Sequence, residues 1–184
     1  MNSKKITVFI FIVALFIGCT TQSQKSIKLN PEMEFINEIF FDFIKNCVSE
    51  ESWNIPIFIK SSFIILEGEI AYEIRKNAEF YLKEIGDTSF REPLKNLVNS
   101  YQLPQKIDID LITNKGTYRL FEDRLFKNQG ILVSLSNPAF NLTKTKACLF
   151  FNNYSYSSFK KFGIAFFKKN NEEWQYYRKW LLTY

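Results

Sequence analysis

The chain contains no histidine among its 184 residues. Histidine is the commonest general base and a frequent metal ligand near neutral pH, so its absence excludes Ser-His-Asp and Cys-His mechanisms. It also excludes the usual catalytic zinc sites and the two-histidine iron sites. Only six glycines are present, and none forms a phosphate-binding loop or a dinucleotide-binding fingerprint. We therefore expect no cofactor, no metal site and no catalytic residues.

Long hydrophobic runs are also scarce. The apolar run Ile6–Gly18 has thirteen residues, whereas a helix that spans a bilayer needs about 20. Lys4 and Lys5 precede the run and the small residue Gly18 ends it, which is the order typical of an export signal. Residues 1–18 are therefore predicted to be a signal peptide that is cleaved from the mature protein.

Cys19 follows this run, and Phe16-Ile17-Gly18-Cys19 resembles a bacterial lipobox, although leucine is usual at the position of Phe16. The resemblance implies diacylglycerol on the Cys19 sulfur, cleavage between Gly18 and Cys19, and N-acylation. Three acyl chains hold a protein on a membrane firmly, because each buried CH₂ contributes about 0.8 kcal/mol. An ordinary cleaved signal with an incidental Cys19 is the alternative.

Small polar residues after Cys19 predict a flexible tether over residues 19–29. They include no Asp at the second mature position and no acidic cluster, so the resemblance favours, for a Gram-negative host, a place in the cell envelope at the outer membrane, with the body facing the periplasm. The remaining residues, 30–184, are enough for a single domain. Loss of Lys4 and Lys5 lowers the formal net charge from +5 to +3, and we expect no nucleic-acid partner. For Cys47 and Cys148, which lie in apolar patterns, we favour buried free thiols over a disulfide.

The apolar residues recur with a helical period in the first half and with a period of two after residue 104. We predict helices over 31–49, 69–85 and 90–101, and strands over 107–111, 131–135, 146–151, 163–168 and 174–182. Pro56 argues against a central strand within 53–59. The predicted fold is α+β, with two or three N-terminal helices packed on a C-terminal antiparallel β-meander and a signal-peptide helix before them. In the last strand, Trp174, Tyr176, Trp180 and Leu182 are predicted to share one face.

The second half, with "FKNQGILVSLSNPAFNLTKTKACLFFNN" followed by "GIAFFKKNNEEWQYYRKWLL", is similar to small uncharacterised lipoproteins of Bacteroidota-type bacteria. The glycine usual in their final hairpin turn is replaced here by Glu172 or Glu173. The resemblance implies a strand meander and a location in the cell envelope. It implies no activity.

Two groups of residues are candidate sites. The segment "NNYSYSSFKKF" supplies the best candidate recognition surface for a protein or glycan, although we favour the interpretation in which alternate rings fill the core and the lysines are solvated. This surface consists of Tyr154, Tyr156, Phe159, Lys160 and Lys161. Asp108 and Asp110 alternate with apolar residues, and paired carboxylates can act in acid–base chemistry or bind Ca²⁺. We favour the solvated face of an edge strand for these two residues.

These observations predict a non-catalytic protein, anchored to the membrane through lipidated Cys19, that binds an unknown protein or glycan partner. An immunity protein against a toxin and a carboxylate-dependent glycan-processing enzyme are the alternatives. The oligomeric state stays open.

Overall fold

A computed structural model describes residues 30–48, 55–99, 105–127, 129–155 and 158–182, with only the backbone for residues 158–160. The predicted signal peptide, the predicted tether, Gly18 and Cys19 lie outside these residues. Within the described ranges, no helix is both long enough and apolar enough to cross a membrane.

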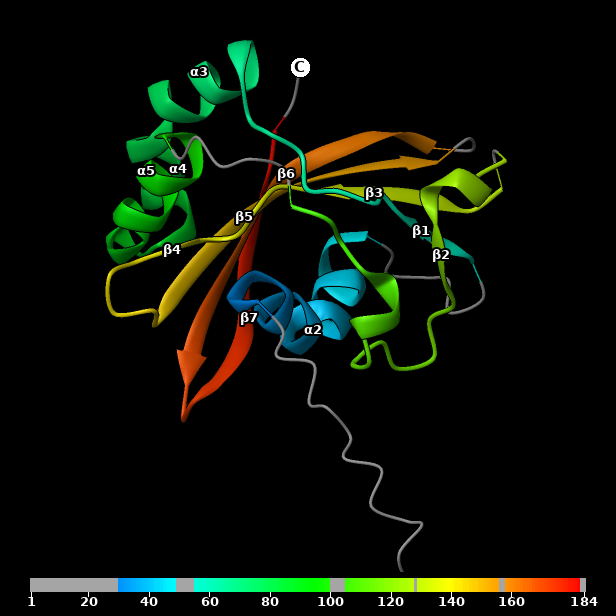
Figure 1. Ribbon diagram of the computed structural model, residues 1–184. Helices are drawn as coiled ribbons and strands as arrows, with labels where there is room; N and C mark the ends of the chain where they lie inside the picture. Colours follow the sequence, from blue (N-terminus) through cyan, green and yellow to red (C-terminus); the bar gives the residue numbers. More distant parts are fainter. Residues whose placement is uncertain (1–29, 49–54, 100–104, 128, 156–157, 183–184) are drawn as a thin grey trace, which may run out of the picture.

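A mixed sheet forms the centre of the fold (Figure 1). Its strands are paired in the order β2 (Leu120–Glu122), β1 (Ile57–Ile59), β3 (Ile131–Leu135), β5 (Lys146–Ser155), β6 (Ser158–Asn170) and β7 (Glu173–Leu181), and the short β4 (Ala139–Phe140) pairs with β5. The α+β class is confirmed. The predicted antiparallel meander describes β5, β6 and β7, whereas β1 runs parallel to both β2 and β3.

Strand β1 corrects the prediction that Pro56 argues against a central strand in this segment. Pro56 lies immediately before the strand, where its missing N–H removes no bond from the ladder. Its carbonyl oxygen accepts the N–H of Ile131 from β3 at 3.0 Å, and Ile57 donates to the carbonyl oxygen of Arg119. All three residues of β1 are buried.

Helices cover both faces of the sheet (Figure 1). On one face lies α2 (Pro31–Phe43), which begins where Asn30 Oδ1 accepts the N–H of Met33 at 2.7 Å and continues as a π-helical turn, Ile44–Val48. On the other face lie α3 (Gly68–Lys76), α4 (Ala78–Ile85) and α5 (Arg91–Asn99). Two separate hydrophobic cores result, one against α2 and the other against α3–α5.

The helix predicted over 69–85 is divided at Asn77, whose backbone departs from helical geometry with φ −101° and ψ 10°. The Asn77 side chain donates to the Glu73 carbonyl oxygen at 3.0 Å and so competes with the regular helical pattern. Gly86 ends α4 in the left-handed conformation, as predicted. In α5, Pro93 occupies the first turn, where its missing N–H is harmless.

The strand predicted over 107–111 is wrong. Residues Ile109–Leu111 form a 3₁₀ turn, and Asp108 Oδ1 accepts the N–H of Asp110 at 3.1 Å. This local bond gives the backbone a partner within the turn, so no ladder forms along the segment. Ile107 and Ile112, which flank the turn, are buried, whereas Ile109 and Leu111 within it are only partly buried.

Strand β7 changes face part-way along its length. The register shifts between Phe166 and Phe167 of β6, so Tyr177 is an extra residue in β7. Before the bulge, Trp174 and Tyr176 pack on the α2 core. After it, Trp180 and Leu182 pack on the α3–α5 core. The prediction of one shared face is therefore wrong, because the bulge inverts the alternation.

Cys47 and Cys148 are buried, free and part of different cores, with the sheet between them. Burial raises the pKa of the Cys47 thiol to about 12, despite an opposing effect of Lys179, and burial also raises the pKa of Cys148. Both side chains are therefore neutral and shielded at physiological pH.

We expect a thiol-specific reagent at pH 8 to modify neither Cys47 nor Cys148 in the native protein and to modify both after unfolding in denaturant without reductant. Because both folded-state pKa values are raised, stability should fall as the pH rises from about 9 towards 12, where the unfolded chain loses protons that the native protein keeps. Unfolded protein in which neither thiol reacts would instead indicate a disulfide.

The β6–β7 turn places Asn171 and Glu172 in the left-handed region, with φ of 49° and 69°. Two positive φ angles are typical of a type I′ hairpin, which favours Asn followed by Gly. Glu172 occupies the glycine position, and its ion pair with Lys169 at 3.2 Å is solvent-exposed.

We therefore expect Glu172→Gly to stabilise the protein by about 1 kcal/mol, because glycine removes the left-handed strain and the exposed ion pair contributes little. Asn171→Gly is the matched control and should give a smaller gain, since asparagine tolerates this conformation. Urea denaturation measures both changes. A lower midpoint for Glu172→Gly would show that the ion pair outweighs the strain.

Candidate functional site

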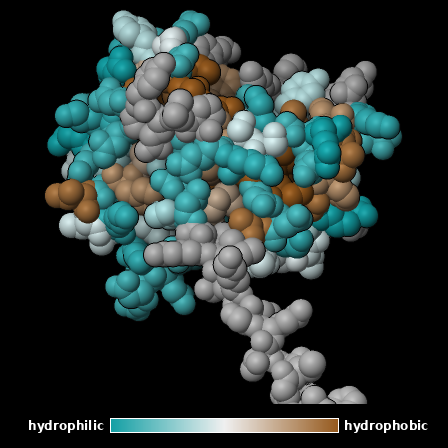
Figure 2. Space-filling view, in the orientation of Figure 1, coloured by the Kyte–Doolittle hydropathy of each residue, from teal (hydrophilic) through white to brown (hydrophobic). Residues whose placement is uncertain are grey.

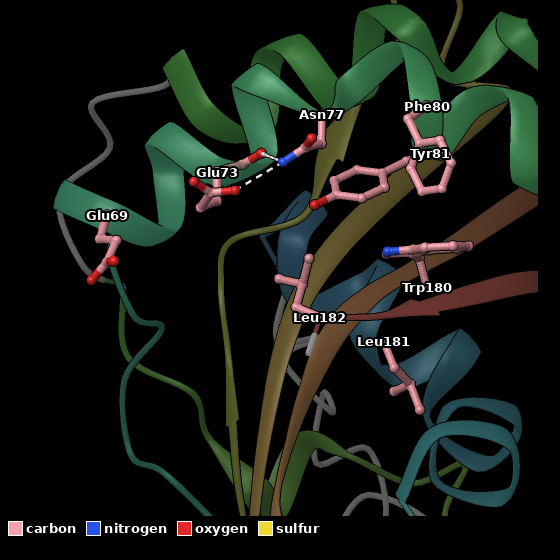
Figure 3. Close-up of a pocket in the computed structure, with 8 residues that line it drawn as sticks. All are labelled: Glu69, Glu73, Asn77, Phe80, Tyr81, Trp180, Leu181 and Leu182. Atoms are coloured by element: carbon pink, nitrogen blue, oxygen red, sulfur yellow. Dashed lines mark hydrogen bonds between the residues drawn. The ribbon is translucent and has the colours of Figure 1, made fainter. Parts of the chain in front are cut away.

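A hollow lies between the α3–α4 pair and the last residues of β7 (Figure 3). Its volume is about 410 Å³, within the usual range for sites that hold small molecules. Among the described residues, the lining contains two carboxylates, one carboxamide, three aromatic rings and two leucines, and no lysine or arginine. In chain order, it consists of Glu69, Glu73, Asn77, Phe80, Tyr81, Trp180, Leu181 and Leu182.

The three aromatic rings form one wall. Phe80 packs edge-on against Trp180, with ring centres 5.5 Å apart and an angle of 88° between the planes. Tyr81 lies over Trp180 at 5.4 Å with a smaller angle of 34°. Phe80 is 52% exposed despite its size. The indole N–H of Trp180 is directed into the hollow (Figure 3) and has no hydrogen-bond partner among the described residues.

Polar groups of α3 form the opposite wall. Glu69 and Glu73 are one helical turn apart, so their carboxylates lie on the same side of the helix. Glu73 Oε2 accepts a hydrogen bond of 2.9 Å from the Asn77 side chain, and Lys76 approaches the same carboxylate only to 3.9 Å. Glu69 has no ion pair or hydrogen bond within the described part of the chain.

Two local irregularities build this hollow. The interruption at Asn77 separates α3 from α4 where the acidic wall meets the aromatic wall. The bulge at Tyr177 turns Trp180 away from the α2 core and towards α4. Gly163 of β6 lies against the backbone of Trp180, and a Cβ atom at this position would be 2.2 Å from the Trp180 carbonyl oxygen.

Of the recognition surface predicted from sequence, the structure describes the side chains of Tyr154 and Lys161; Tyr156 and the side chains of Phe159 and Lys160 lie outside the described part. Tyr154 is 42% exposed and packs edge-on against Phe126, 6.1 Å away. Lys161 is opposite Asn153 in the sheet, and consecutive residues such as Asn153 and Tyr154 point to opposite faces. Tyr154 and Lys161 therefore do not form one surface.

Asp108 and Asp110 line neither the hollow near Trp180 nor the second one described below. The Asp108 side chain caps its own turn. Within the described ranges, no three histidine, cysteine, aspartate or glutamate side chains are grouped so that they could hold a metal ion.

A second hollow of about 540 Å³ lies at the other end of β7, beside α2. Its lining includes Glu38, Trp174 and Glu173. Here the Glu38 carboxylate already accepts the backbone N–H of Trp174, and the Trp174 ring packs edge-on against Phe35, 5.0 Å away. Its tryptophan is therefore engaged in the α2 core.

The teal colour over most of the face in Figure 2 shows a largely hydrophilic surface in which the hydrophobic areas are small and separated.

The helix predicted over 69–85 carried no site prediction for Glu69 or Glu73, and Trp180 was predicted to share a face with Trp174, Tyr176 and Leu182. One signal was present: Glu69, Glu73, Asn77 and Phe80 recur at steps of four and three beside the apolar stripe, so they form a second, mixed stripe. The bulge that brings Trp180 to this stripe has no comparable signal in the sequence.

No protein family, curated protein or solved structure matches the chain. The chemistry of the hollow therefore follows from its own geometry.

Proposed function

We propose that this protein is a lipid-anchored, non-catalytic binding protein of the cell envelope and that its partner docks at the hollow between α3, α4 and Trp180. The observation that carries the proposal is the position of this hollow. The chain enters the fold at Asn30, and α2 packs through Phe35 against Trp174, at the beginning of β7. The hollow is at the end of the same strand and on the other face of the sheet.

This separation suits a tethered binding protein, because α2 and the α3–α4 pair lie on opposite faces of the sheet (Figure 1). A lipid on Cys19 and a tether over residues 19–29 would connect the membrane to the α2 side of the body. Eleven residues reach at most about 40 Å when extended. The hollow near Trp180 would then lie on the side of the body farther from the tether, whereas the second hollow, beside α2, would lie on the tethered side.

The geometry also favours binding over catalysis. Glycoside-cleaving carboxylates stand about 5–9.5 Å apart on either side of the bond that breaks. Glu69 and Glu73 are successive residues of one helix face, so they would approach a ligand from the same side. The chain has no histidine to act as a base.

Photo-crosslinking in living cells tests the docking site. Phe80 is replaced by p-benzoylphenylalanine in the full-length chain; Leu142, which is 87% exposed and outside the hollow, receives the same replacement as the control. We expect a light-dependent adduct of defined mass at position 80, absent at position 142 and lost when Glu69→Gln and Glu73→Gln are added. No adduct at position 80, or the same adduct at both positions, would contradict the proposal.

A further inference from the structure

We infer that the hollow near Trp180 binds an arginine side chain presented by a protein partner; this inference rests on the proposed function and names the ligand class of the same site. The guanidinium group would lie against the Glu69 and Glu73 carboxylates, beside the aromatic wall. The inference rests on charge, on the balance of hydrogen-bond donors and acceptors, and on the aromatic lining.

The hollow is acidic in a chain that is basic overall. The sequence has 24 lysines and arginines against 19 aspartates and glutamates, yet the part of the lining that the structure describes has two carboxylates and no basic side chain. The nearest cation described at these carboxylates is Lys76, which is 3.9 Å from Glu73, has a 58% exposed side chain and lies 5.8 Å from the centre of the Tyr72 ring. Among the described residues, Glu69 therefore has no ion pair, and Glu73 has only this long ion pair with an exposed lysine.

The hollow also offers more acceptors than donors. The Asn77 amide nitrogen is already used, since it donates both to the Glu73 carbonyl oxygen and to the Glu73 carboxylate. The Asn77 Oδ1 atom and both carboxylate oxygens of Glu69 accept no hydrogen bond from the described residues, whereas Glu73 Oε2 already accepts one. A guanidinium has five N–H donors and no acceptor, whereas sugar hydroxyl groups are both. A donor-only cation therefore fits this lining better than a glycan does.

The aromatic wall favours arginine over a small inorganic cation. A planar guanidinium stacks on aromatic rings, is more weakly hydrated than an ammonium, and can bind two carboxylates at once. The Trp180 indole N–H is a donor directed into the hollow. It would repel a bare cation, but it can donate to a backbone carbonyl oxygen of the peptide that carries the arginine. Tryptophan and tyrosine also commonly anchor protein interfaces.

A titration of the full-length chain in detergent micelles tests the inference. The probe is the capped tripeptide Gly-Arg-Gly, and the matched control replaces arginine with citrulline, which has the same shape and no charge. The readout is the ¹⁵N–¹H signal of the Trp180 indole, identified as the signal that Trp180→Phe removes. We expect a saturable shift at peptide concentrations up to about 10 mM, and binding at least tenfold weaker for the citrulline peptide.

Glutamine variants inside and outside the hollow locate the effect. Glu69→Gln with Glu73→Gln should weaken arginine-peptide binding at least tenfold, whereas Glu84→Gln, an exposed carboxylate of α4 outside the hollow, should change it less than twofold. High salt should weaken binding by the wild type. No movement of the Trp180 signal, or equal losses in the Glu84→Gln variant, would overturn the inference.

The two proposals fail in different ways. If an oligosaccharide of N-acetylglucosamine shifts the Trp180 signal and the arginine peptide does not, the ligand class is wrong and the docking site stands. If the arginine peptide binds in vitro but position 80 gives no adduct in cells, the hollow has the inferred chemistry and the proposed function is wrong.

Discussion

Replacement of Gly163 by alanine is expected to destabilise the protein by about 3 kcal/mol or more and to move the Trp180 indole signal. Gly163 lies in β6 opposite Leu181. An added Cβ would be 2.2 Å from the Trp180 carbonyl oxygen and 3.2 Å from the Leu181 Cα atom. These are backbone atoms that cannot rotate away, so the strands must separate. The melting temperature should fall by on the order of 10 °C.

Gly86→Ala is the control for this prediction. Gly86 has φ of 73°, but a Cβ at this position would meet nothing within 4 Å. The cost there is the left-handed backbone alone, about 1 kcal/mol. If the two variants lose equal stability, or if Gly163→Ala leaves the Trp180 signal in place, close packing of β6 on β7 does not position the hollow.

Replacement of Asp87 by asparagine is expected to cost about 3 kcal/mol at neutral pH. The Asp87 side chain is 18% exposed and joins the α3–α5 layer to the sheet through Lys168, at 2.7 Å, and Lys146, at 3.3 Å. These lysines are directly opposite each other on β6 and β5. Without the carboxylate, two like charges would face each other beside the Phe90 ring, which lies 5.0 Å from Lys146 Nζ.

The same carboxylate predicts a pH dependence. Partial burial of Asp87 tends to raise the pKa, but hydrogen bonds from Lys168, Ser89 and Lys146 outweigh it and hold the pKa well below its usual range. Because the pKa of Asp87 is lower in the folded than in the unfolded protein, the ionised carboxylate stabilises the fold at pH values above the unfolded pKa, which is near 4. This stabilisation is lost as the pH falls further. Urea denaturation from pH 7 to pH 2 should show this loss in the wild type and a smaller one in Asp87→Asn.

Glu79→Gln provides the surface comparison. Glu79 accepts two hydrogen bonds from Arg91, at 2.8 and 2.7 Å, but both side chains are mostly exposed. Solvent screens such pairs, so the stability at pH 7 should change far less than in Asp87→Asn. Equal losses in the two variants would show that the Asp87 cluster is no stronger than an ordinary surface ion pair.

Sequence periodicity predicted the elements whose packing dominates over local chemistry. The 31–49 segment repeats apolar residues at helical steps after Asn30 and Pro31, and α2 begins there. The strands of the β5–β6–β7 unit were likewise visible, as were the Gly86 cap and the final hairpin. In these places, propensity, capping and burial favour the same structure.

The features that periodicity did not predict depend on single local hydrogen bonds or on pairing partners that are distant in sequence. The Asp108 cap replaced a strand with a turn, and the Asn77 side chain divided a helix. Strand β1 has three residues, and its parallel partners lie more than 60 positions away, so no local period marks it. The bulge at Tyr177 depends on pairing with β6. The hollow requires both the division at Asn77 and this bulge, so the sequence alone did not indicate it.

Metabolic labelling with a palmitate analogue tests most directly whether the body is tethered to a membrane. The wild type and Cys47→Ala should both carry the label and sediment with membranes, because Cys47 is a buried thiol of the folded body. Cys19→Ala should lose the label and move to the soluble fraction. Label that persists in Cys19→Ala, or a wild type without label, would contradict a lipid anchor at Cys19.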